Sequence, residues 1–318
     1  MHANNGAAPR RARAKENAMS TPASKPRVGI VGVGLMGLGI ATNVQRNGWP
    51  VGFMDHPGNQ PTDALVSKGA VKHSSGAEVA RDSDIIIICV TGTPEVEDVL
   101  FDKKGGVLLG LSRGTIVIDC STAIPSSTLR IAKEVERAGG RFIDAPMTRT
   151  PKEAMEGRLN LIVGGERALF DECLPLLKSF AENITFAGPV GSGHTLKLLH
   201  NFVSLGFSTV LAEAAACADK AGIDAAVFVD VLAKGGGAGV ILQRLQPYIL
   251  ARDCSGFRFS ISNAHKDLSY YTAMANDLHA PHDSANGVLK VLEGAKAGGH
   301  AQAPLPELVT ILNRAAAS

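Results

Sequence analysis

The sequence predicts an α/β protein in which a Rossmann-type, doubly wound and mostly parallel sheet is followed by an all-α C-terminal domain. Three observations predict this fold class. A β-branched run at residues 28–31 leads into glycines with GxGxxG spacing, short apolar runs alternate with amphipathic stretches up to residue 188, and the sequence beyond residue 188 contains only helical and loop patterns. The 318 residues exceed the length of one typical domain, so we expect two domains.

The first predicted strand ends in a glycine-rich turn, and a helical stretch over residues 38–47 follows at once. This order places backbone N–H groups and the positive end of a helix dipole beneath a pyrophosphate. In such a motif the first glycine permits the turn, the second lets the phosphates approach, and the third lets the helix pack on the strand. We therefore expect the loop to bind a dinucleotide through Gly32, Val33, Gly34, Leu35, Met36 and Gly37. The alternative is an ordinary glycine-rich turn.

The second predicted strand, residues 51–54, ends at Asp55, eighteen residues after Gly37. An acidic residue at this place accepts hydrogen bonds from the adenosine ribose hydroxyls. A 2′-phosphate would meet Asp55 as like charge, and no Arg or Lys follows before Lys68. We therefore favour NAD over NADP as the cofactor. Alternatively, Asp55 only begins the turn at residues 56–59.

Further apolar runs complete the predicted sheet, and a helical pattern over residues 126–138 lies among them. The runs are residues 85–90, 115–120, 141–145, 159–163 and 184–187. In a parallel sheet, ligands bind beyond the carboxyl ends of the strands. Polar or turn residues stand at three such ends, at 91–94, 121–122 and 144–146.

The C-terminal part begins with one long helical stretch, about residues 193–221, that is apolar almost all round. Such a helix is buried in a larger assembly. We expect three units: a disordered tail over residues 1–25, a cofactor-binding domain over 26–188, and an all-α substrate and oligomerisation domain over 189–318. The long helix joins the two domains, and a cleft is expected between them.

Lys197 and Asn201 lie one helical turn apart on this long helix, on a face that Ser204 and Ser208 continue. A lysine on a mostly buried helix costs free energy unless it is paired or lines a wet cleft. One interpretation is a catalytic lysine whose pKa is lowered by burial, so that it exchanges a proton near neutral pH. The other is that this stripe is the solvent-exposed edge of the helix.

Composition argues against several classes of function. A net charge of +2 and an aromatic content of 5% do not favour nucleic acid or anionic membranes as partners. Five scattered cysteines without a CxxC pair indicate a reducing compartment, and the nine histidines show no metal-ligand spacing. The tail lacks the apolar core of a secretory signal; the alternatives are a short Arg-rich organellar transit peptide, against which Glu16 argues, and a leader before a start at Met19. We expect a cytoplasmic protein with no metal and no membrane span.

Several motifs taken together resemble the β-hydroxyacid dehydrogenase family, which includes 3-hydroxyisobutyrate dehydrogenase and 2-hydroxy-3-oxopropionate (tartronate semialdehyde) reductase. The resemblance covers residues 27 to about 315. It rests on Gly32–Gly37, Asp119-Cys120-Ser121-Thr122, Asp144-Ala145-Pro146, Gly193–Asn201 and His265-Lys266-Asp267-Leu268. Each motif is weak alone, and their combination is specific.

The resemblance implies roles for individual residues. Lys197 would donate a proton to the carbonyl oxygen, and Asn201 would hold Lys197 or the substrate. Lys266 would contact the cofactor, and three residues would border the nicotinamide ribose, namely Val90, Thr91 and Thr122. The substrate would meet Ser121, Asn201 and Asp267. Without the family, Lys266 and Asp267 read equally well as a surface pair, and Thr122 as a helix N-cap.

The sequence departs from the family after Asp144-Ala145-Pro146. Members of the family usually continue with Val-Ser-Gly-Gly, whereas this chain reads Met147-Thr148-Arg149-Thr150. Thr148 keeps the hydroxyl, and a guanidinium binds a carboxylate, sulfonate or phosphate bidentately. We expect Thr148, Arg149 and Thr150 to bind the substrate anion. An Arg-Thr pair at this point is similar to the sulfolactaldehyde reductase branch. Alternatively, Arg149 faces solvent or contacts Glu153.

These observations predict an NAD-dependent reductase or dehydrogenase that interconverts a small anionic 3-hydroxy acid and its semialdehyde. The enzymatic alternatives are sulfolactaldehyde reduction and oxidation of a four-carbon hydroxy acid. Imine reductases share the fold but characteristically replace the lysine, so Lys197 argues against them. A cofactor-binding module without catalysis is the alternative outside enzymes, and Lys197 argues against it too. The family also implies a homo-oligomer, a dimer or a tetramer.

Overall fold

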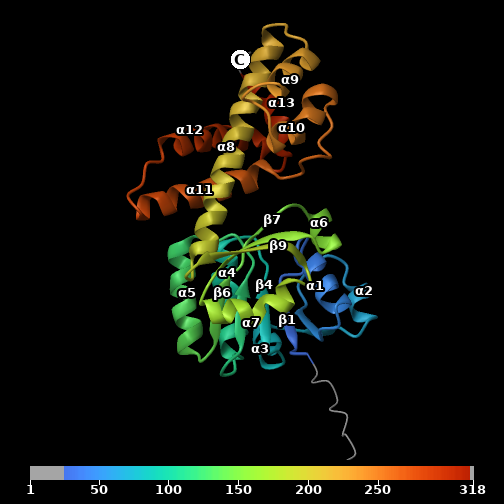
Figure 1. Ribbon diagram of the computed structural model, residues 1–318, viewed down its shortest axis with the longest axis vertical. Coiled ribbons are helices and arrows are strands. Elements are labelled where there is room, and N and C mark those ends of the chain that lie inside the picture. Colours follow the sequence, from blue (N-terminus) through green and yellow to red (C-terminus); the bar gives the residue numbers. More distant parts are fainter. Residues whose placement is uncertain (1–24, 316–318) are drawn as a thin grey trace, which may run out of the picture.

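The computed structural model describes residues 25–315 (Figure 1). Apart from Lys25, the predicted tail with its alternative start at Met19 lies outside the described residues.

The N-terminal half of the described chain is built around a nine-stranded sheet in the order β3-β2-β1-β4-β5-β6-β8-β7, with β9 paired to β8. The strands are β1 Val28–Val31, β2 Val51–Met54, β3 Val71–His73, β4 Ile85–Ile88, β5 Ile116–Asp119, β6 Arg141–Asp144, β7 Met147–Thr148, β8 Leu159–Gly164 and β9 Ala181–Gly188. The pairs from β3 through β6 and the β8–β9 pair are parallel, whereas β8 runs antiparallel to β6 and β7. The predicted mostly parallel α/β fold is confirmed.

Helices cover both faces of this sheet, which explains why the central strands read as continuous apolar runs. The helices are α1 Gly37–Arg46, α2 Asp63–Val66, α3 Gly76–Arg81, α4 Thr93–Phe101, α5 Pro125–Arg137, α6 Pro151–Glu156 and α7 Arg167–Leu177. Side chains of β4 alternate between two cores: Ile87 packs with residues of α1 and α7, whereas Ile86 and Ile88 pack with residues of α3, α4 and α5. A short 3-10 turn covers Val107–Leu109.

The remainder of the described chain is helical. Helix α8, Ser192–Lys220, runs from the sheet through the C-terminal domain, and the later helices gather around it (Figure 1). They are α9 Ala225–Ala233, α10 Val240–Ala251, α11 Ile261–Asp277, α12 Asp283–Ala295 and α13 Leu308–Ala315. A π-helical segment, Lys296–His300, and a 3-10 turn, Leu305–Glu307, lie between the last two. A third apolar core lies among these helices.

Among the described helices, α8 alone is long and apolar enough to cross a membrane by length and composition. In the fold, one side of it packs inside the C-terminal core through Leu198, Leu205 and Leu211. Its apolar character therefore has a sufficient explanation in the packing of this domain.

Candidate active site between the two domains

The glycine loop lies where the strand order reverses between β1 and β4, the usual dinucleotide site of such sheets. Gly32 has a φ of +98°, and a Cβ there would lie 2.3 Å from the carbonyl oxygen of Cys89. A Cβ on Gly37 would overlap the carbonyl oxygen of Gly32. By contrast, nothing lies within 4 Å of a Cβ position on Gly34. The loop is closed toward the sheet and open at Gly34, which fits a pyrophosphate at the start of α1.

The segment after β2 folds back onto this loop. The backbone N–H of Val33 donates to Asn59 Oδ1 at 3.2 Å, and the N–H of Gln60 donates to the Val33 carbonyl at 2.9 Å. Asp55 is about half exposed at the tip of β2, and its Oδ1 lies 3.5 Å from Lys72 Nζ on β3. Neither Asn59 nor Lys72 could be identified from the sequence, because their contacts form only when neighbouring strands are paired.

Lys197 and Asn201 point toward α11. Asn201 Nδ2 donates to Asp267 Oδ2 at 2.7 Å, and Asp267 is buried. Its other oxygen, Oδ1, lies 3.1 Å from Lys266 Nζ. Lys197 is partly buried, and burial lowers the pKa of its ammonium group from 10.5 to about 8; Asp267 opposes this shift, and the positive Lys266 adds to it. An amine with this pKa gains and loses a proton near neutral pH.

Helix α11 also crosses to the nucleotide-binding half at the turn after β4. Lys266 Nζ donates to the carbonyl oxygen of Thr91, and its ammonium lies 5.4 Å from the centre of the Tyr270 ring. The N–H of Thr93 donates to Tyr270 Oη at 3.1 Å. The structure thus brings the expected ribose-bordering residue Thr91 together with Lys266, and adds Tyr270, which carries no signal in the sequence.

A buried polar layer fixes the start of α8 beneath this site. The N–H groups of Gly191 and His194 donate to the two oxygens of Asp144, at 2.7 and 2.8 Å. His194 Nε2 lies 3.2 Å from the carbonyl oxygen of Ser121, and the Ser121 hydroxyl accepts from the N–H of Val90 at 3.0 Å. Burial raises the pKa of the neighbouring Asp119 carboxyl. Ser121 is only 3% exposed, so its side chain braces the Val90 turn.

The residues expected to hold the substrate anion have other partners in the structure. Thr148 Oγ1 accepts from Asn160 Nδ2 at 3.1 Å. The Arg149 guanidinium forms an ion pair with Glu182 and donates to the carbonyl oxygen of Arg158, and its backbone φ is +82°. The Thr150 side chain caps α6 together with Glu153. The contact of Arg149 with Glu153 that was considered from the sequence is thus replaced by one with Glu182.

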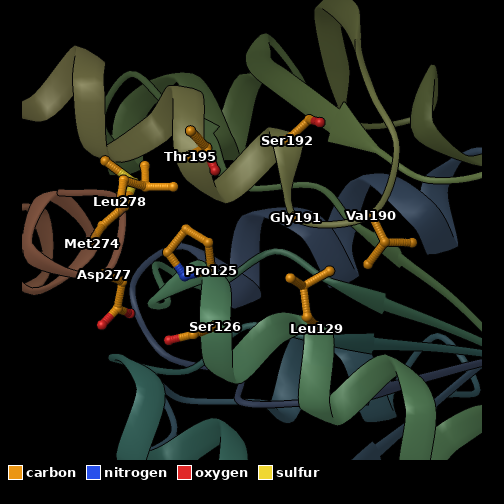
Figure 2. A pocket seen from close by; sticks show the side chains of 10 residues that line it. All are labelled: Pro125, Ser126, Leu129, Val190, Gly191, Ser192, Thr195, Met274, Asp277 and Leu278. Carbon is orange, nitrogen blue, oxygen red and sulfur yellow. The ribbon is translucent and has the colours of Figure 1, made fainter. Parts of the chain in front are cut away.

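A cleft of about 910 Å³ opens beside this region. Its walls come from the sheet (Thr148, Arg149, Asn160, Ile162, Thr185), from α8 (Leu196, Leu199, His200, Val203, Ser204, Phe207) and from α10 (Val240, Ile241, Arg244). A smaller pocket of about 250 Å³ lies where α5, the start of α8 and the end of α11 meet (Figure 2). Its lining includes Pro125, Leu129, Thr195 and Met274, but none of the residues expected to do chemistry.

Comparison with known proteins agrees with this geometry. Residues 27–188 match the family described as the NAD binding domain of 6-phosphogluconate dehydrogenase. Residues 191–312 match the family described as NAD-binding of NADP-dependent 3-hydroxyisobutyrate dehydrogenase.

The individual proteins to which this chain is similar are reductases and dehydrogenases. The chain is 32% identical to 2-hydroxy-3-oxopropionate reductase of Escherichia coli K12, over 80% of this chain and 87% of that one. It is 30% identical to 3-sulfolactaldehyde reductase of the same organism, over 86% and 91% of the two chains. The crystal structure of 3-hydroxyisobutyrate dehydrogenase from Salmonella typhimurium superposes with a TM-score of 0.78 at 27% identity, covering 90% of this chain and 99% of that one.

Proposed function

The chain belongs to the β-hydroxyacid dehydrogenase family of NAD(P)-dependent oxidoreductases that act on CH–OH groups, and we propose that it interconverts a small anionic 3-hydroxy acid and its semialdehyde with Lys197 as the proton donor. The observation that carries this proposal is the placement of Lys197 on one helix face with Asn201, which donates a hydrogen bond to the buried carboxylate of Asp267. Burial, which lowers the pKa of Lys197 to about 8, supports it. We propose the domain division at residues 188–189 as part of the same interpretation.

In this mechanism the bound nicotinamide supplies the hydride for reduction and accepts it in oxidation. Lys197 Nζ, as the ammonium, gives its proton to the carbonyl oxygen, and in the reverse direction the neutral amine removes the hydroxyl proton. The side chain of Asn201, one helical turn from Lys197, is fixed by the hydrogen bond that its Nδ2 donates to Asp267 Oδ2. Lys266, bound to Thr91 and Asp267, brings α11 against the turn that borders the nicotinamide ribose.

We propose NAD as the preferred cofactor, bound by residues 32–37, with Val90, Thr91, Thr122 and Lys266 around the nicotinamide half. Asp55 supports this preference because its carboxylate repels a 2′-phosphate. Lys72, 3.5 Å away, partly offsets that repulsion. Dissociation constants of NADH and NADPH, measured by fluorescence, check the preference; tighter binding of NADPH would contradict it.

The Lys197→Ala variant tests the proposal. Loss of the general acid lowers kcat at least about 100-fold. The dissociation constant of NADH should stay nearly unchanged, because the proposed cofactor contacts do not include Lys197. Near-normal turnover would overturn the mechanism. The non-enzymatic alternative, a cofactor-binding module, predicts NADH binding without turnover in the unaltered chain as well.

A second candidate is sulfolactaldehyde reduction, favoured by Arg149 and by the similarity to a 3-sulfolactaldehyde reductase. In both candidates Thr148 and Arg149 bind the substrate anion. An anion at Arg149 has to compete with Glu182.

A panel of carboxylate and sulfonate semialdehydes with the Arg149→Gly variant separates the candidates, because a sulfonate enzyme loses its sulfonate activity most. If both substrate classes respond only weakly, Arg149 does not bind the anion. Glu182→Gln is the companion variant and is expected to strengthen anion binding if Arg149 takes part.

We further propose that the protein works as a cytoplasmic homo-oligomer. Val210, which α8 leaves 61% exposed and which lies outside the cleft, supports association through this helix.

A further inference from the structure

The cleft beside the proposed catalytic lysine has mainly apolar walls. Leu196, Leu199, Val203 and Phe207 of α8 form one side, and Val240 and Ile241 of α10 continue it. His200 and Ser204 of α8 also line it and stand within one or two helical turns of Lys197. Lys197 and Asn201 are not among the lining residues, so the cleft adjoins the proposed reaction centre along α8 and extends toward α10.

Two arginines line this cleft, and their electrostatic situations differ. The charge of Arg149 is balanced by its ion pair with Glu182. Arg244 is half-buried, and no carboxylate of residues 25–315 lies within the 4 Å range of an ion pair with it. Its guanidinium lies 5.5 Å from the centre of the Phe257 ring, an apolar support that leaves the N–H donors available. A cation in this setting favours an anionic ligand.

The neighbouring His200 lies within reach of the charges of both Lys197 and Arg244. The pKa of its imidazole is lowered, first by partial burial and further by the positive charges of Lys197 and Arg244, against the effect of its hydrogen bond to Asn201. Lys197 and Arg244 thus act on the same group from α8 and α10. An organic anion between them would offset this repulsion.

We propose that Arg244, from the α10 wall, binds the anionic group of the substrate in addition to Thr148 and Arg149 from the sheet wall, and that the substrate is a semialdehyde or hydroxy acid with more than three carbons. This inference rests on the proposed function. The carbonyl end lies at Lys197, the apolar walls of α8 and α10 contact the carbon chain, and the acid group meets the guanidinium. A cleft of about 910 Å³ is far larger than a three-carbon semialdehyde needs, since cavities of this size hold drug-sized ligands.

The test compares Arg244→Gln with Arg252→Gln, which removes the same charge from the exposed end of α10, where Arg252 stacks on Tyr248. Malonate, succinate and glutarate semialdehydes are assayed with NADH, together with the neutral methyl ester of succinate semialdehyde. We expect the four- and five-carbon acids to have higher kcat/KM than malonate semialdehyde. Arg244→Gln should raise KM for these acids at least about tenfold and leave the ester unaffected. Arg252→Gln should leave both unchanged.

A binding measurement without turnover accompanies the assay. Isothermal titration of glutarate into the protein with NAD present should give a dissociation constant at least about tenfold weaker in Arg244→Gln than in Arg252→Gln. The proposal is overturned if Arg244→Gln affects the acid and the ester equally, if malonate semialdehyde remains the best substrate, or if the variant only changes the oligomeric state in sedimentation. If Lys197→Ala loses activity while Arg244→Gln keeps the wild-type KM for the acids, this inference is refuted and the proposed function stands.

Discussion

At the scale of single residues, the environment of Lys197 decides the pH dependence of the reaction. Burial lowers the pKa of Lys197 to about 8, and the charge of Asp267 works against this effect. Reduction needs the protonated amine and oxidation the neutral one. We therefore expect kcat for reduction to fall as the pH rises through about 8, and kcat for oxidation to rise over the same range, as measured in initial-rate pH profiles.

The Asp267→Asn variant is the control for this pH profile. It removes the negative charge that favours the protonated lysine. The pH at which kcat for reduction falls and kcat for oxidation rises should therefore decrease by about one unit. The amide keeps an oxygen that can accept the Asn201 hydrogen bond. If the pH at which kcat changes is the same in this variant as in the wild type, or if kcat of the wild type changes only near pH 10, Lys197 is not the titrating group.

The residue pattern on one helix could be predicted from the sequence, but the partners from other elements could not. Lys197 and Asn201 were recognisable by their helical spacing, and Asp267 only through the family resemblance. Glu182, Arg244 and Tyr270 carry no local signal, because their roles arise from contacts between segments distant in the chain. The ion pair of Arg149 with Glu182 shows the consequence, since a sequence motif identifies a cation but not the charge that balances it.

At the scale of elements, α11 is joined to the turn after β4 by a contact that requires a glycine. A Cβ on Gly92 would lie 2.4 Å from Tyr270 Oη, the atom that accepts the Thr93 N–H bond. Gly92→Ala should therefore displace Tyr270 and weaken the contacts of Lys266 with Thr91 and with the Tyr270 ring. We expect a loss of NADH affinity of roughly threefold to tenfold, as for one hydrogen bond.

A double-mutant cycle isolates this contact. In a Tyr270→Ala background, Gly92→Ala meets no phenol, so its additional effect on NADH affinity should be close to zero. Tyr270→Phe, which keeps the ring beneath Lys266 and loses only the hydroxyl, should fall between wild type and Tyr270→Ala. Additive effects of Gly92→Ala and Tyr270→Ala would show that the two residues do not act together.

Element prediction succeeded where side-chain burial was strong. The central strands β4 and β5 are buried on both faces, so their apolar runs were unambiguous. Two short strands were missed. In β3, Val71 and Lys72 are exposed at the sheet edge, and β7 has only two residues, Met147 and Thr148. Neither contains enough buried apolar residues to produce a periodic pattern, and their pairing depends on the neighbouring strands β2 and β8.

At the scale of the whole molecule, the exposed apolar stripe of α8 predicts association of two or more copies. Val210 is 61% exposed and lies outside both pockets, so the proposed active site does not account for it. A charge placed in a buried subunit interface costs several kcal/mol, so Val210→Asp should dissociate the assembly, as measured by sedimentation velocity. Leu109→Asp, at a 59% exposed leucine in the nucleotide-binding half, is the matched control and should leave the assembly intact. If Val210→Asp sediments like the unaltered chain, α8 does not form the interface. Because Lys197 lies on α8 whereas the glycine loop follows β1, dissociation should lower kcat more than NADH affinity.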